Sequence, residues 1–528
     1  TTVAAGDVTI DNSGASATTL GSTEVGGNYT ITATNEPITQ AAGTAIQVQG
    51  NLTATGSSIL LTGAANLVGG TTSLPATSTT ELVQAGVITL PSENVTGNLT
   101  VISQATSRSF SGSAVSGSAI LLDDAGNSIG GTISTSASPP TVTNNGYVQT
   151  GIQQATSTTI SVSGTASFTA ESSSAGTLGV QLTNGGNSFG TLVLSGDTVA
   201  VNNSAVGVTT IGSASAGTSL TLTAAAAVAQ TGAISTPSLT VDTTGAVTLN
   251  NADNDIGSID VTSGGGAVSV ANAGSLSVDG VDAGGSTVNL QAGGTGDLTQ
   301  TGALRSVSTL TVDAGGGVVL TNSGNSIQSL AASQAGTALQ LYNGGGALSI
   351  TGPVSTATGD LLLRTTGDLT VATGGVLDAA HGNVVVSTEG DGNFINDSSQ
   401  AGSALVVGSG DRWLVYSDTP DLVSGAHTVK GGLTSDFRHY GNATYTSYAP
   451  ASVTESGDGF IYDYATPALT VNAAINGTPS QVYGDNPTAT LGYTISSGLV
   501  DSEDSASNVV TGGTPTYSMA LSDTLSAG

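Results

Sequence analysis

A short marker of the form Asn-x-apolar-Gly recurs along most of this chain at a nearly regular period. Copies of the marker begin at Asn66, Asn127, Asn187, Asn254, Asn325 and Asn393, the last two without the glycine. The intervals between them are 61, 60, 67, 71 and 68 residues. A self-similar period indicates a chain whose units stack side by side, each burying its apolar face against its neighbours.

Each period contains very short segments in which apolar residues alternate with Thr, Ser or Asp. Examples are Val247–Leu249, Val268–Val270 and Val318–Leu320. Neighbouring segments are about 8 to 12 residues apart, and alternation with a period of two predicts half-buried strands. Three such strands would make a coil of about 20 to 24 residues, so we predict an all-β fold, a right-handed parallel β-helix.

Two other repeat folds fit this pattern less well. A β-propeller needs blades of about 40 to 45 residues with four strands, and an array of β-sandwiches needs larger core residues. In a β-helix the inward rows stack about 4.8 Å apart along the axis. We expect the narrow interior to leave no room for aromatic rings. We expect the recurring Asn residues to occupy equivalent corners and to hydrogen-bond backbone groups between coils.

The composition limits the chemistry of the chain. Asp and Glu number 36 against six Lys and Arg, a net charge of −30. This charge argues against nucleic acid as a partner and against an anionic membrane surface. The absence of cysteine excludes disulfides and thiol nucleophiles.

Catalytic and metal sites find little support in the sequence. Carboxylate pairs could cleave polysaccharides, and the candidates are Asp123 with Asp124, Asp253 with Asp255, and the region of His381. No basic residue lies near them in sequence, so we interpret them as solvated turns and predict no catalytic residue. We expect no cofactor. The oxygen ligands that Ca²⁺ prefers could come from Asp391, Asn393, Asn396 and Asp397, but we interpret these as turn and capping residues.

The last quarter of the chain differs in composition. Twelve of the 19 aromatic residues lie in the last 128 positions, and four of the six basic residues lie beyond position 360. We therefore predict a shaft over 1–405, an aromatic-rich end of the shaft over 406–467, and an incomplete β-sandwich-like module over 468–528. Trp413, Tyr416, Phe437 and Tyr440 could form a platform on which sugars stack, or a small aromatic core that closes the shaft; we favour the core.

Specific residues at this end carry a resemblance to a known family. Asn393-Phe394-Ile395-Asn396, Arg412-Trp413-Leu414-Val415-Tyr416-Ser417 and Gly459-Phe460-Ile461-Tyr462 resemble the end of the β-helix in exoproteins of the filamentous haemagglutinin family. Val482-Tyr483-Gly484-Asp485 looks like the opening of an MBG-type module. The resemblance implies two-partner secretion through an outer-membrane barrel and an extracellular or bacterial outer-surface location. The N-terminal secretion domain of the family is not found, so we expect an internal fragment of a longer exoprotein.

These observations together predict a structural adhesin or filament protein. Its partners would be a host or neighbouring-cell surface or matrix. The alternatives are a carbohydrate-active β-helix enzyme and a matrix or sheath protein that polymerises. An open coil exposes unpaired backbone groups at its edge. Residues 1–50 hold one aromatic residue, Tyr29, and nothing comparable to the aromatic-rich end of the shaft. We therefore expect that Thr1 is not the biological start or that another subunit covers this end, with end-to-end self-association as a consequence.

Overall fold

The computed structural model confirms an all-β chain. The described residues are 2–84 apart from 15, 64, 71, 75 and 77–79, the strands from β13 (Glu93–Asn94) to β21 (Ile160–Thr169) without their connections, 179–476, and 490–509. Over these residues the protein has about 3% helix, and its parallel strands stack as a β-solenoid of about 17 turns. The chain divides into two compact units, residues 1–327 and 328–528.

The first coils of unit 1 form three parallel sheets, one on each face of the coil. Strands of the first face are β1 (Thr2–Ala4), β4 (Thr23–Val25), β7 (Ile46–Val48) and β10 (Leu67–Val68). The second face holds β2 (Val8–Asp11), β5 (Tyr29–Ala33), β8 (Leu52–Gly56) and β11 (Thr72–Ser73), and the third begins with β3 (Thr18–Leu20), β6 (Ile38–Gln40), β9 (Ile59–Leu61) and β12 (Thr80–Gln84). Three strands therefore make one coil, as the sequence predicts.

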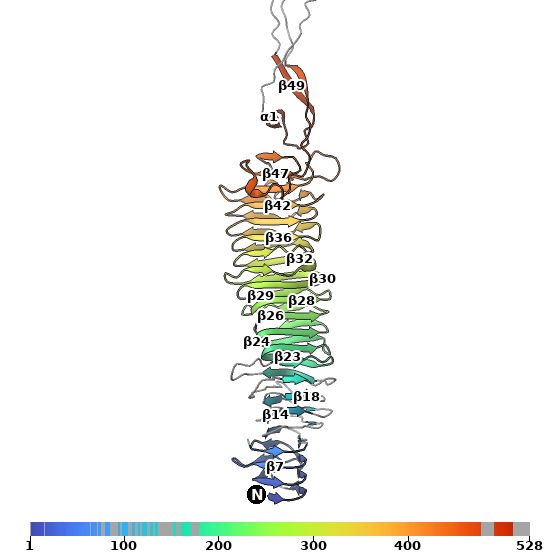
Figure 1. The fold of residues 1–528 in the computed structure, drawn as a ribbon, viewed down its shortest axis with the longest axis vertical. Coiled ribbons are helices and arrows are strands. Elements are labelled where there is room, and N and C mark those ends of the chain that lie inside the picture. Colours follow the sequence, from blue (N-terminus) through green and yellow to red (C-terminus); the bar gives the residue numbers. More distant parts are fainter. Residues whose placement is uncertain are drawn as a thin grey trace, which may run out of the picture. The chain divides into compact units, whose positions relative to one another are not determined.

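The later coils of unit 1 are built from longer strands, which Figure 1 shows as successive rungs. They are β22 (Val180–Leu182), β23 (Ser188–Asn203), β24 (Val208–Ala224), β25 (Ala227–Gln230), β26 (Ile234–Thr243), β27 (Val247–Leu249), β28 (Asp255–Ser263), β29 (Val268–Asn272), β30 (Leu276–Ala292), β31 (Leu298–Gln300), β32 (Leu304–Ala314) and β33 (Val318–Leu320). Several exceed the predicted length because pairing continues around a corner through a register shift, as between Ser215 and Leu220. Many hydrogen bonds between adjacent coils join residues 20 to 23 apart, as those of Asn254 with Ile234 and of Asn28 with Asp7 do.

Unit 2 continues the same pattern of three strands per coil. After β34 (Ile327–Leu330) at the boundary come β35 (Ser333–Ala335), β36 (Leu339–Asn343), β37 (Leu348–Ile350), β38 (Pro353–Thr356), β39 (Leu361–Thr365), β40 (Leu369–Val371), β41 (Val376–Ala379), β42 (Val384–Thr388), β43 (Phe394–Asn396), β44 (Leu405–Val407), β45 (Trp413–Ser417), β46 (Phe437–His439) and β47 (Gly459–Tyr462). Short 3₁₀ turns occur at η1 (Ala401–Ser403) and η2 (Pro450–Ser452). An antiparallel pair, β48 (Thr470–Asn476) with β49 (Thr490–Ser497), and the short helix α1 (Ala506–Val509) follow.

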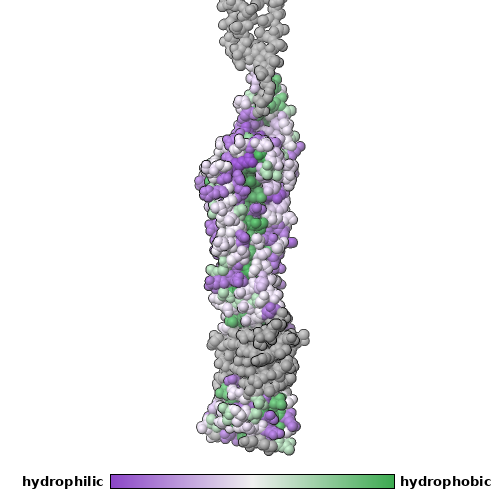
Figure 2. Space-filling view, turned by 60° about the vertical axis from the view of Figure 1, so that its left-hand side comes forward, coloured by the Kyte–Doolittle hydropathy of each residue, from purple (hydrophilic) through white to green (hydrophobic). Residues whose placement is uncertain are grey.

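The core is a set of apolar rows that run from coil to coil. Leu220, Leu239 and Ile259 are register partners in β24, β26 and β28, and all are fully buried. Each such side chain contributes about 1.5–3 kcal/mol by leaving water. In β27 the burial alternates, with Val247 and Leu249 inside and Thr248 exposed. The space-filling view shows a mostly pale or polar surface with a narrow apolar strip (Figure 2).

One expectation about the interior was wrong. Tyr29, Phe168, Phe189 and Phe394 are buried within the coils, so the interior does hold aromatic rings. The rings of Phe168 and Phe189 meet edge to face, with centroids 5.4 Å apart. Two rings from adjacent coils thus fill the space together. Among the described residues, no helix has the length and apolar character needed to cross a membrane.

Candidate functional site

The last coil of unit 2 ends in an unusual strand order. β45 pairs with β42 on one side and with β47 on the other, and β46 pairs with the far side of β47. The strand at the edge of this sheet is therefore β46, which comes before its neighbour β47 in the sequence. β46 has only three residues, including Arg438 and His439. A short, charged edge strand is a poor template for pairing with another chain.

An excursion of the chain covers the outer side of these last coils. Leu362, Val385 and Leu414 are register partners in a row that would otherwise meet solvent. Residues 443–455, here called the end cover, place Ala443 and Val453 against this row and bury most of it. The end cover thus replaces the polar outer face of an ordinary coil with a second small core.

Arg412 fixes the end cover through hydrogen bonds to its backbone. Its guanidinium donates to the carbonyl oxygens of Glu455 (2.7 Å), Pro450 (3.2 Å) and Val453 (3.5 Å). These carbonyls belong to the first residue of η2 and to the segment directly after it, so one side chain fixes the turn that carries the apolar contacts. A planar group with five donors suits this task better than a lysine ammonium.

Arg364 attaches the other end of the cover. Its guanidinium lies over the ring of Tyr342 (4.7 Å) and over the ring of Tyr445 in the end cover (4.5 Å). Glu389 forms an ion pair with the same guanidinium and accepts a hydrogen bond from the Tyr342 hydroxyl at 3.1 Å. Two aromatic rings and one carboxylate thus contact the same guanidinium, and one of the rings belongs to the end cover.

A third contact involves a histidine and an acid. His439 Nδ1 lies 2.8 Å from Glu455 Oε1, and the Tyr448 hydroxyl donates to Glu455 Oε2 at 2.7 Å. The His439 ring stacks on the Tyr448 ring, with centroids 4.2 Å apart. Burial raises the pKa of Glu455, but the hydrogen bonds from His439 and Tyr448 outweigh it and lower the pKa to about 2.

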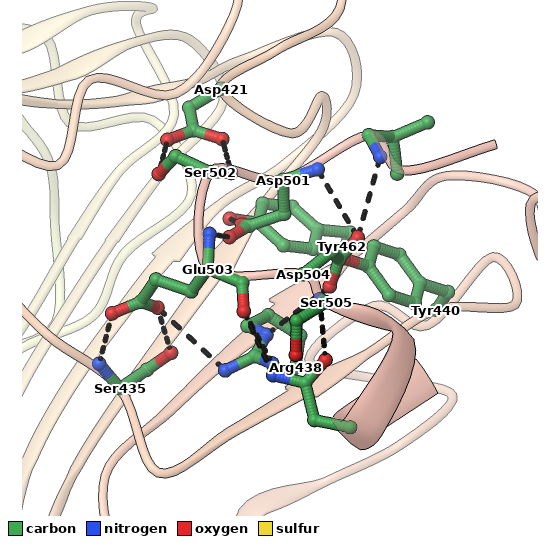
Figure 3. A network of polar contacts seen from close by, with 12 residues as sticks. Asp421, Ser435, Arg438, Tyr440, Tyr462, Asp501, Ser502, Glu503, Asp504 and Ser505 are labelled. Atoms are coloured by element: carbon green, nitrogen blue, oxygen red, sulfur yellow. Dashed lines mark hydrogen bonds and ion pairs between the residues drawn. The ribbon is translucent and has the colours of Figure 1, made fainter. Parts of the chain in front are cut away.

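The remaining two cations of unit 2 meet the segment that follows β49. Lys430 Nζ lies 2.5 Å from Asp501 Oδ1 and 2.9 Å from Glu503 Oε2. Arg438 lies 3.8 Å from Glu503 and 3.5 Å from Asp504. This set, with the tyrosines described next, is called the junction network, and Figure 3 shows most of its members. It ties the end of the shaft to residues 498–509.

A buried tyrosine, Tyr462, and a half-buried one, Tyr440, complete the junction network. The Tyr462 hydroxyl donates to Asp501 Oδ2 at 2.7 Å, and the Tyr440 hydroxyl donates to Asp504 at 2.9 Å. Burial and the charge of Asp501 raise the pKa of Tyr462 well above its ordinary value. Burial and the same charge also raise the pKa of Tyr440. Both phenols therefore stay protonated and act as donors.

Two glycines directly after Lys430 form the backbone turn that follows this lysine. Gly431 and Gly432 have positive φ values of 56° and 91°, a conformation that glycine adopts without steric cost. A Cβ at Gly431 would collide with the backbone oxygen of Asn396. The turn is fixed from that side, because the Asn396 side chain donates to the carbonyl oxygens of Lys430 (3.0 Å) and Gly431 (3.3 Å).

A cavity of about 370 Å³ adjoins the junction network. Phe437, Arg438, Tyr440 and Asp504 contribute to its wall, together with Leu469 and other residues of the module. The predicted platform is thus divided between two environments. Trp413 and Tyr416 are buried, 4% and 1% exposed, whereas Phe437 and Tyr440 are half-buried at this cavity.

The marker asparagines of unit 1 lie at corners and bond the backbone. Asn254 Oδ1 accepts from the Ile234 N–H (2.8 Å), and Asn325 Oδ1 accepts from the Leu304 N–H (2.9 Å). Asn66 accepts in the same way from Ile46 at 2.8 Å. All are at most 2% exposed. Each also donates to the carbonyl five residues before it, as Asn187 does.

Sequence reasoning missed the partner of these asparagines. Gln40, Gln230 and Gln300 lie one coil earlier, and each exchanges two hydrogen bonds with the marker amide of the next coil. The signal was present, because Gln-Thr-Gly-Ala occurs at both 230–233 and 300–303. A second buried corner set, including Asn203 and Asn272, was also missed.

The remaining candidate residues are either exposed or outside the part of the chain whose side chains are described. The side chain of Asn127 and the pair Asp123 and Asp124 lie outside the part whose side chains are described. Asp253, Asp255 and His381 are exposed.

The two asparagines considered for Ca²⁺ accept hydrogen bonds from the backbone. Asn393 Oδ1 accepts from the Thr419 N–H at 2.9 Å, and Asn396 Oδ1 accepts from the Ser398 N–H at 3.1 Å. Among the described residues, no group of three or more His, Asp or Glu side chains could hold a metal ion.

The fold, with the end cover and the junction network at the end of unit 2, defines a repeat protein of the β-solenoid class. More particularly, the chain belongs to the family described as Repeats of unknown function (DUF5649), whose repeat matches residues 5–75, 77–136, 141–195, 196–263 and 265–334. These repeats have the period seen in the marker series and stop before the end cover. No curated protein and no solved structure gives a significant match to the chain.

Proposed function

We propose that the chain is the shaft of a secreted, surface-attached adhesin or extracellular filament protein. The observation that carries this proposal is a parallel solenoid whose last coil in unit 2 is covered by the end cover and is bound to the module through the junction network. A stack of coils supplies length with nearest-neighbour contacts, and a fixed junction transmits force to whatever follows. The resemblance to the filamentous haemagglutinin family supports export through an outer-membrane barrel and a place on the bacterial outer surface.

The proposal can be tested by locating the protein on the cells that produce it. Antibodies raised against residues 179–467 should label intact cells in immunogold electron microscopy, and the label should vanish in a strain without the gene. The same strain should attach less to surfaces or matrix, and the restored gene should recover attachment. Label that appears only after permeabilisation would contradict the proposal.

The enzymatic alternative remains open to a direct assay. The purified chain should release no product from acidic polysaccharides if its role is structural. Turnover that disappears on replacing both Asp253 and Asp255 with asparagine would favour the enzyme instead. Electron microscopy of the native surface would separate a projecting fibre from a polymerised sheath.

A further inference from the structure

The chain contains a single lysine, and that lysine is buried. Lys430 is the only one in 528 residues, and its side chain is 7% exposed. Its nearest carboxylate, Asp501, is fully buried and lies 71 positions later in the chain. A lysine is seldom fully buried, and burying an ion pair costs free energy that the same volume of apolar side chains would not. The placement therefore calls for a reason other than charge pairing.

The surroundings of the pair match what amide formation needs. Lys430 Nζ lies 2.5 Å from Asp501 Oδ1 and 4.9 Å from the centre of the Phe460 ring. A second carboxylate, Glu503, lies 2.9 Å from the same nitrogen. We propose that Lys430 and Asp501 react with each other to form an intramolecular amide bond between the end of the shaft and the module.

The reaction is a condensation that needs no oxidant or external reagent. A proton passes from the Lys430 ammonium to the Asp501 carboxylate, which leaves a neutral amine beside a neutral acid. The amine nitrogen attacks Cγ and forms the N–C bond. The C–OH bond then breaks, the nitrogen loses a proton, and the hydroxyl leaves as water. The products are one amide and one water molecule.

Each neighbouring group has a definable part in this step. Glu503 Oε2 can accept the proton that leaves the nitrogen and return it to the departing hydroxyl. The Tyr462 hydroxyl (2.7 Å) and the Glu503 backbone N–H (2.9 Å) donate to the two oxygens of Asp501. Such donors stabilise the charge that develops on the tetrahedral intermediate. The ring of Phe460 shields the amine from water.

The environments of the three acids explain why Asp501 is the one that reacts. Although burial raises the pKa of Glu503, hydrogen bonds from Ser435 and Lys430 lower it below the ordinary value, so Glu503 stays ionised as a base. Asp504 is engaged by Arg438 and by the Tyr440 hydroxyl. Asp501 alone combines full burial with direct contact to the amine.

The mass of the purified 528-residue chain, measured in denaturant, tests the proposal directly. It should be lower than the sequence mass by one water molecule. Trypsin cleaves after free lysine and arginine, so an amide at Lys430 should block cleavage there. The expected product is the peptide Trp413–Arg438 joined to the peptide that begins at His439. An unmodified mass together with a free Trp413–Lys430 peptide would overturn the proposal.

Variants separate the amide from a plain ion pair. Lys430→Arg and Asp501→Ala should both restore the full sequence mass. Glu503→Gln keeps the shape of the side chain but removes the base, so it should leave most of the chain unlinked while the circular dichroism spectrum stays native. Asp504→Asn, a matched change beside the reacting pair, should stay linked. Linkage in Glu503→Gln equal to the parent would overturn the assigned role of Glu503, and a water loss that persists in Lys430→Arg would overturn the proposal.

Discussion

Replacing Asn254 with leucine removes the polar contacts of one corner while leaving a side chain of similar size. In the structure, the Asn254 Oδ1 accepts from the Ile234 N–H at 2.8 Å and from the Gln230 amide. Its Nδ2 donates to the carbonyls of Leu249 at 3.2 Å and Ala271 at 2.9 Å. The four partners lie in three successive coils, so one amide links three coils.

The size of the effect follows from which partners are left unsatisfied. The buried Ile234 N–H loses its acceptor, which costs about 1–3 kcal/mol, and each lost bond to a carbonyl costs about 0.5–1.5 kcal/mol. We expect a local destabilisation of about 3 kcal/mol. Because coils contact only their neighbours, the loss should be local and one global transition need not report it.

Amide hydrogen exchange in the native state reports such local opening. A loss of about 3 kcal/mol should speed exchange in β26 and its neighbouring strands by roughly 100-fold, since about 1.4 kcal/mol is tenfold. The control is Asn250→Ala, an exposed asparagine four positions away whose Oδ1 accepts a hydrogen bond from the Ser269 hydroxyl at 2.8 Å. It should change exchange by about twofold or less. Equal effects of the two variants would refute the corner assignment.

Three further predictions concern the core, the end cover and acid. Val247→Asp buries an unpaired charge and should cost several kcal/mol, about 3 or more, whereas Thr248→Asp on the exposed face should leave the melting curve nearly unchanged. Arg364→Lys keeps the charge but loses the stacking on two rings, so proteolysis within the end cover should accelerate, with Arg305→Lys in unit 1 as the control. Because the pKa of Glu455 falls to about 2 from an ordinary 4.5, its contribution to stability is present above pH 4.5 and is lost as the pH falls toward 2. Glu455→Gln should flatten this part of the curve of stability against pH, and an unchanged curve would contradict the contact with His439.

The coil could be predicted from sequence because its determinants are local. The alternation in Val247–Leu249 or Val318–Leu320 places residues on opposite faces whatever the rest of the chain does. The marker asparagines could be assigned to corners from their period. Their glutamine partners were not predicted, because the contact joins different coils and Gln230 precedes Asn254 by 24 residues.

The end cover and the junction network could not be predicted in this way. The position of β47 between β45 and β46 reverses the order of two strands, and no local pattern encodes such a reversal. The contact of Lys430 with Asp501 spans 71 residues. The buried rings of Phe168 and Phe189 fit because a pair from adjacent coils shares one space, which the sequence of either coil alone does not reveal.

The few Lys and Arg side chains of unit 2 hold the segments at its end that do not repeat. An interior coil is stabilised on both sides by identical neighbours, so apolar rows and backbone pairing suffice and charge is unnecessary. The last coil has such a neighbour on one side only, and its other contacts must come from segments that do not repeat. In a chain of net charge −30, acids are available everywhere for such contacts, and the position of a cation decides where a non-repeating segment can be held. All four cations of unit 2 act in this way: Arg364 and Arg412 hold the end cover, and Lys430 and Arg438 hold the module. The solenoid of unit 2 is therefore ended by electrostatic contacts placed where the repeat can no longer stabilise itself.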